Sequence, residues 1–116
     1  MDVEPAVSDT LRQVALVANQ TVIMATPVDT GRARANWQIS IDTEITGQVD
    51  GTDAQGAIAR NAATIRGYRN GAIILQNNVP YIGRLNDGWS AQAPAGFVEK
   101  ALQTAARVVA KAKVVK

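Results

Sequence analysis

The chain contains no cysteine and no histidine, and only five of its 116 residues are aromatic. Without cysteine it can form no disulfide bond and no thiolate site, and nothing implies an oxidising compartment. Without histidine it cannot build a Ser-His-Asp triad, a Cys-His pair or a histidine-ligated metal centre. Because these absences remove most hydrolase mechanisms, we predict that the protein is not an enzyme and uses no cofactor.

Phosphate-binding and membrane-spanning sequences are absent as well. Neither Gly-x-Gly-x-x-Gly after a strand nor Gly-Lys-Ser/Thr occurs. No apolar run reaches the ~20 residues that cross a bilayer, and the segment from Met1 to Pro5 is acidic where a secretory signal is basic. We therefore expect no nucleotide, no membrane partner and a soluble, cytoplasmic protein.

Carboxylates are the remaining side chains for catalysis. Asp42 and Glu44 alternate along a predicted strand, a spacing that can present paired carboxylates to a metal ion or a sugar. Solvated acids also fill the outward positions of an ordinary amphipathic strand, and we favour this interpretation. The Asp-Gly-Thr-Asp sequence at residues 50–53 lacks the spacing and the closing Glu of an EF-hand, so it indicates a turn.

The length and composition, 116 residues and 47% hydrophobic, predict a single domain over residues 1–116 with a core of aliphatic side chains. Charge is unevenly placed. Residues 1–53 carry eight acids and three arginines (−5), whereas residues 54–116 carry nine lysines and arginines and two acids (+7). Such polarity can bring complementary surfaces together or attract a polyanion, although solvated surface charges give the same pattern.

Two long helices are predicted, one in each half. Apolar residues recur at spacings of three and four from Val7 to Ala25, with Ser8 or Asp9 as the cap and Pro27 beyond the end.

The second long helix is predicted from Pro94 onward, where Phe97 begins another apolar stripe. Its last turns carry Lys111, Lys113 and Lys116, which are favourable at the negative end of the helix dipole. These lysines are also candidate contacts to DNA, non-specific because no aromatic residues are interleaved to stack on bases. A small basic DNA-binding protein is therefore the alternative function.

The middle of the chain predicts strands. Strict alternation from Trp37 to Ile45 is typical of a strand with one wet face, and the short apolar run at residues 72–75 predicts a buried strand. The predicted fold class is α+β, with the long N- and C-terminal helices packed on a small antiparallel β-sheet and one short additional helix.

That short helix is predicted near residues 58–65, after a glycine-rich loop at residues 47–56. Thr52 or Asp53 would cap its start and Gly67 would end it.

A run of turn-forming residues connects the first helix to the first strand. Asp29 and Thr30 can hydrogen-bond to nearby backbone N–H groups, Gly31 can adopt a positive φ, and Arg32 and Arg34 flank the turn. By themselves these residues indicate a tight connection in which Asp29 can neutralise an arginine.

A second informative run follows the second strand. Asn78 and Pro80 turn the chain, Tyr81 begins a short helical segment, and Gly88 releases the chain toward the last helix. Tyr81 and Trp89 can also be ordinary core or rim aromatics.

Together the two runs resemble the neck and tail-completion family of long-tailed bacteriophages. These small virion proteins pair Pro-x-Asp-Thr-Gly-x-x-Arg after the first helix with a later Asn-Asn-x-Pro-Tyr … Gly-x-Ser … Ala-Pro-x-Gly. The chain has Asp87 where the family usually has Glu before the glycine. The matching residues are Pro27, Asp29, Thr30, Gly31, Arg34, Asn77, Asn78, Pro80, Tyr81, Leu85, Gly88, Ser90, Gln92, Ala93, Pro94 and Gly96.

The resemblance implies a structural virion protein that forms a six-fold or twelve-fold ring and joins or completes the tail at the head–tail interface. The implied partners are further copies of the chain, a head-side connector or stopper protein, the tail tube protein and, non-specifically, packaged DNA. The implied location is the virion neck, after assembly in the host cytoplasm. The family-motif and candidate interface residues are Asp29, Thr30, Gly31, Arg32, Arg34, Trp37, Asn78, Pro80, Tyr81, Asp87, Gly88 and Trp89.

Overall fold

The computed structural model describes residues 5–27, 31–87 and 96–114, and within these ranges it confirms the α+β prediction. Two long helices pack on a two-stranded antiparallel sheet. The elements in chain order are α1 (Pro5–Ala25), α2 (Arg32–Ala35), β1 (Trp37–Ile41), α3 (Ala54–Arg66), β2 (Ile73–Asn77), α4 (Ile82–Asn86) and α5 (Phe97–Val114).

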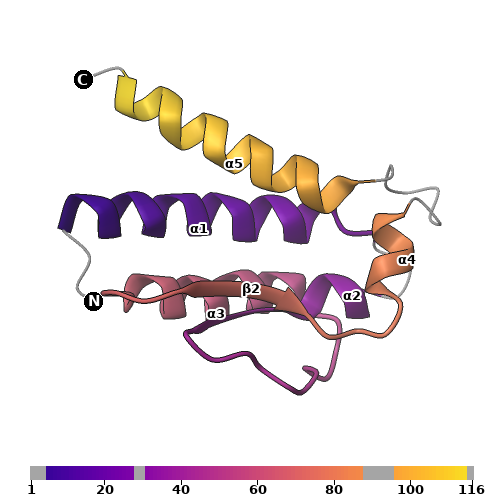
Figure 1. Cartoon of the computed structure of the whole chain (residues 1–116). Helices are drawn as coiled ribbons and strands as arrows, with labels where there is room; N and C mark the ends of the chain where they lie inside the picture. The colour runs from indigo at the N-terminus through magenta and orange to yellow at the C-terminus, as the bar shows by residue number, and fades with distance from the viewer. Residues whose placement is uncertain (1–4, 28–30, 88–95, 115–116) are drawn as a thin grey trace.

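The elements are stacked in layers around α1. Figure 1 shows α5 lying along one side of α1, with α3 and β2 on the other side. The chain between β1 and α3 forms a further layer, drawn below the sheet in this view. The central cluster of buried residues comes from α1, β1, α3 and α5 and contains Val22, Ile23, Trp37, Ala57, Phe97 and Ala101.

The first helix starts earlier than its sequence predicts. It begins at Pro5, so Ser8 and Asp9 lie inside the helix and the predicted cap is wrong. The Ser8 hydroxyl, which is buried, instead donates a hydrogen bond to the backbone oxygen of Arg69 at 2.8 Å. The helix ends at Ala25, just before Pro27, as predicted.

The caps of the other helices combine local and distant residues. Asp53 caps α3 by accepting a hydrogen bond from the Gly56 N–H at 2.8 Å, and Gly67 follows its last residue, as predicted. At α5, the side-chain oxygen of Asn86 accepts from the Val98 N–H at 2.9 Å. The start predicted at Pro94 lies outside the described residues.

The first strand is shorter than the alternating pattern predicts. It ends at Ile41 because Asp42 adopts a left-handed backbone conformation with φ 66°. The predicted wet face is also wrong, since Gln38 is only 8% exposed. The second strand lies at Ile73–Asn77, two residues beyond its predicted end, and pairs with β1 in antiparallel register with Ile39 opposite Leu75.

Two short helices complete the fold. The segment Arg32–Ala35, expected to be a tight connection, contains one helical turn, α2, before β1. The segment after Tyr81 forms α4, in agreement with the predicted helical segment. No helix in the described part of the chain is both long and apolar enough to cross a membrane.

Candidate interaction site

The first motif forms the corner between α1 and β1. Gly31 has φ 72°, as predicted, and a side chain there would approach the Thr52 Cβ to 2.8 Å. Both the backbone conformation and the lack of space therefore require glycine at this position.

Arg34, a motif residue, binds the C-terminal end of α1. Its Nη2 donates to the backbone oxygen of Met24 at 2.8 Å, and its Nε donates to that of Thr26 at 3.1 Å. These carbonyl groups lie where a helix leaves its acceptors unpaired, and the positive charge is favourable there. Arg32 is exposed instead and donates to the side chain of Gln48.

Trp37 belongs to the core. Its side chain is 5% exposed, and the indole N–H donates to the Thr26 hydroxyl at 2.8 Å. That hydroxyl donates in turn to the backbone oxygen of Val22 at 2.6 Å. Trp37 therefore fixes the start of β1 against the end of α1.

The second motif begins beside the first. Asn77 pairs with Trp37 across the sheet, and its side-chain amide donates to the backbone oxygen of Ala33 at 2.8 Å. The two motifs, far apart in sequence, therefore share one corner of the fold. The next residue, Asn78, reaches the chain that follows β1 and donates to the oxygens of Ile45 and Gly47 at 2.9 and 2.8 Å.

The chain between β1 and α3, residues 42–53, covers one face of the sheet, and we call it the strap. Gln76 of β2 holds it by accepting from the Ile45 N–H and donating to the Ile45 oxygen, both at 2.8 Å. The buried Asn36 makes the same pair of bonds to Val49, at 2.7 and 3.0 Å. Side-chain amides thus replace the backbone ladder that a third strand would form.

A buried amide network closes the edge of β1 that faces α3. Asn61, 1% exposed, accepts from the Ile39 N–H at 3.2 Å and donates to the oxygen of Trp37 at 2.7 Å. It also donates to the side chain of Asn19 on α1 at 2.8 Å. Arg60 adds a bond to the Trp37 oxygen at 3.1 Å.

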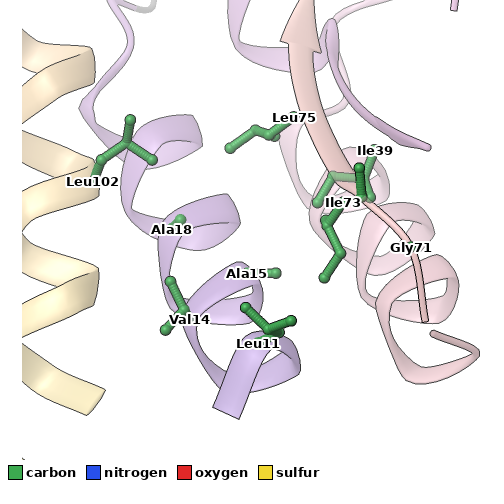
Figure 2. A pocket seen from close by; sticks show the side chains of 10 residues that line it. Leu11, Val14, Ala15, Ala18, Ile39, Gly71, Ile73, Leu75 and Leu102 are labelled. Carbon is green, nitrogen blue, oxygen red and sulfur yellow. The ribbon is translucent and has the colours of Figure 1, made fainter. Parts of the chain in front are cut away.

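The other face of the sheet leaves an apolar groove of about 360 Å³ beside β2. Figure 2 shows Leu11 and Ala15 of α1 opposite Ile73 of β2, with Leu102 on α5. Leu11 and Leu102 are 38% and 47% exposed, although both are large apolar residues. The groove is lined by Leu11, Val14, Ala15, Ala18, Ile39, Gly71, Ala72, Ile73, Leu75 and Leu102.

The carboxylate pair considered from the sequence does not share a strand face. Asp42 lies beyond the end of β1, and its carboxylate accepts from the Ala72 N–H at 2.8 Å. Glu44 lies on the exposed strap. Among the described residues there is no group of three or more acidic side chains placed to hold a metal ion.

The remaining predicted residues are dispersed. Pro80 and Asp87 are exposed, and Tyr81 is half-buried. Lys111 and Lys113 belong to α5. The predictions for Asp29, Thr30, Gly88, Trp89 and Lys116 lie outside the described residues, as do the side chains of Lys111 and Lys113.

The groove and the strap were not predicted from the sequence. One feature of the sequence indicates the groove. Residues 70–83, which include the strand β2, carry no charged side chain. The strap had a signal in the alternation that continues beyond Ile41, but its attachment depends on amides from distant positions. Such long-range contacts are not encoded in local periodicity.

Comparisons with known proteins identify no relative of the chain. No protein-family model matches it. No curated protein and no solved structure matches it either.

Proposed function

We propose that the chain is a structural protein of the phage neck, which assembles into a ring and joins or completes the tail at the head–tail interface. The proposal rests on the resemblance in the two motifs. One structural observation supports it: both motifs meet at a single corner, where Asn77 bonds to Ala33 and pairs with Trp37. The two stretches that carry the motifs are therefore adjacent in space, as is expected of residues that serve one interaction site.

The distribution of charge suits such a ring. A closed ring requires a heterologous interface, in which one surface of a copy meets a different surface of the next. The strap contains four acids, all exposed, and no base, whereas α5 carries Lys100, Arg107, Lys111 and Lys113 with one acid, Glu99. The strap and α5 lie on opposite sides of the molecule (Figure 1).

Assembly is testable with the purified chain. We expect size-exclusion chromatography with light scattering to give one closed oligomer, and negative-stain microscopy to give annular particles with a central channel. The same measurement is made after mixing with tailless heads that carry the connector, because a head-side partner can nucleate the ring. A chain that stays monomeric in both conditions contradicts the proposal.

The alternative proposal is a small basic DNA-binding protein, favoured by the exposed Lys100 and Arg107 on the outer helix. A salt-dependent gel shift by the monomer would favour it, and no binding at low salt would remove it. Replacing Lys111, Lys113 and Lys116 with Gln tests the DNA contact in either function. We expect weaker DNA retention and a shallower salt dependence with unchanged unfolding; unchanged retention would contradict the contact.

A further inference from the structure

The β2 strand has one open edge. The Asp42 N–H donates to the Ala72 oxygen at 2.8 Å, which fixes the phase of the ladder. The antiparallel register then directs the backbone groups of Ile73, Leu75 and Asn77 away from β1. Within the described ranges no hydrogen bond uses these groups, and no helix or strand is drawn in front of β2 in Figure 1.

This edge lacks the features that keep edge strands from pairing. Natural edge strands are usually protected by a charge, a proline or a bulge. Residues 70–79 contain none of the charged residues or prolines, and all five residues of β2 are half-buried. The apolar groove of Leu11, Leu75 and Leu102 continues from the same edge (Figure 2). An open apolar edge next to an open apolar groove is a surface suited to a further strand.

The strap presents a second open edge. Its backbone is bound at alternate residues, Ile45, Gly47 and Val49, by the side chains of Gln76, Gln38 and Asn36, and the chain bends at Gly47. Glu44, Thr46 and Gln48 lie between these attached residues, and in the described part of the chain their backbone groups are available to a partner. These three residues are exposed, and no backbone hydrogen bond is made by them in the part of the chain that the structure describes.

The charges of the two edges are compatible. The strap has a net charge of −4 from Asp42, Glu44, Asp50 and Asp53. The β2 edge carries no charge, and the chain from residue 54 onward carries +7. The exposed Arg69 lies two positions before Gly71, which lines the groove. An acidic strap thus meets no like charge at β2, whereas two straps or two basic faces would repel each other.

We propose that the strap of one copy adds to the open edge of β2 in the next copy and that this pairing is the repeating interface of the assembly. This proposed interface rests on the proposed function, because that function requires a ring. The contact is heterologous, since strap and β2 are different surfaces, and it can therefore repeat around a closed ring. Main-chain hydrogen bonds join the copies, and the groove receives apolar side chains at the interface.

Because the wild-type chain has no cysteine, single cysteines report the interface without background. Thr46→Cys on the strap is mixed with Leu75→Cys on β2 under mild oxidation. Scanning positions 44, 46 and 48 against 73 and 75 covers the possible registers, since a disulfide requires Cα atoms within roughly 7 Å. We expect covalent dimers in the mixture at levels at least roughly tenfold above either variant alone. As a control for cross-links formed by random collision, Ala63→Cys, at an exposed position on α3, is mixed with Leu75→Cys in place of the strap variant.

The other outcomes separate this interface from ring assembly itself. If oligomers form but no strap–β2 pair cross-links above the control, the proposed strap–β2 interface is wrong, and the proposal that the chain forms a ring is retained. If Leu75→Cys alone cross-links, β2 pairs with β2 in a two-fold dimer and the interface is wrong. If no oligomer forms with or without connector-bearing heads, both the interface and the proposed function fail.

A proline variant tests the pairing without a cysteine in the core. Thr46→Pro removes a backbone N–H that makes no hydrogen bond within the described residues, whereas Thr46→Ala keeps it. We expect Thr46→Pro to raise the concentration at half-assembly by roughly tenfold, the effect of one or two lost hydrogen bonds, and Thr46→Ala to leave it unchanged. Equal assembly of both variants, each folded by circular dichroism, would overturn the proposal.

Discussion

The two faces of the small sheet are covered in different ways. On one face α1 and α5 contribute apolar side chains, and at the adjoining edge of β1 the buried Asn61 links the strand to α1. On the other face the strap is held by Asn36, Gln38, Gln76 and Asn78, and all its residues except Ile45 and Val49 are exposed. Apolar contacts in the core stabilise the fold strongly, whereas the partly buried amides of the other face position an exposed segment whose hydrogen bonds water can replace more easily. The face covered by the helices forms the core, and the face covered by the strap presents a surface to solvent.

The largest effect is expected on the core side, from Asn61→Ala. The change leaves the Ile39 N–H, the Trp37 oxygen and the Asn19 amide with fewer partners in the interior. Buried unpaired groups cost about 1–3 kcal/mol each when uncompensated, so we expect a loss of about 3 kcal/mol in the free energy of unfolding. Urea denaturation measures it, with the exposed Gln55→Ala on the same helix as control. A loss of stability no larger than that of the control would contradict the role of Asn61 in the buried hydrogen-bond network.

An intermediate effect is expected where the strap leaves the sheet. Gly71 has φ 96°, and a Cβ there would lie 2.4 Å from Asp42 Oδ1. Gly71→Ala should cost about 2 kcal/mol, because it strains the backbone and displaces the Asp42 carboxylate from Ala72.

The matched control for this change is Gly47→Ala on the strap, where no atom lies within 4 Å of the added Cβ. Thermal unfolding of the two variants gives the comparison. Similar midpoints would show that the junction at Asp42 does not constrain the strap.

The smallest effect on global stability is expected from Gln76→Ala. The variant loses both hydrogen bonds to Ile45, but the exposed strap can bond to water, so we expect a loss of about 1 kcal/mol. Hydrogen exchange at the Ile45 amide should accelerate, while the amide of Ile23 in the core keeps its protection. The exposed Gln13→Ala serves as control. A loss as large as that of Asn61→Ala would mean that the strap is part of the core.

The sequence predicts the elements that depend on local patterns. The helical stripe ending before Pro27 and the cap at Asp53 are confirmed because periodicity and capping act over a few residues. The alternation through Ile45 failed as a strand prediction, since a partner strand and the backbone at Asp42 decide where pairing ends. Ser8 failed as a cap because it bonds to a residue far along the chain.

The candidate surface was less predictable than the fold. Motif residues such as Arg34 and Trp37 were expected at an interface, but Arg34 binds the end of α1 and Trp37 lies in the core. The open edge and the groove arise from the register of β2 and from the placement of Leu102 on α5. Both depend on tertiary packing, which composition and spacing do not specify.

A cryo-electron-microscopy map of the wild-type assembly, alone or on connector-bearing heads, measures the arrangement of copies most directly. We expect a closed ring of identical chains in which residues 43–49 of each copy lie beside Ile73–Asn77 of the next. A two-fold dimer joined through β2, or a chain with no ordered assembly on heads, would contradict it.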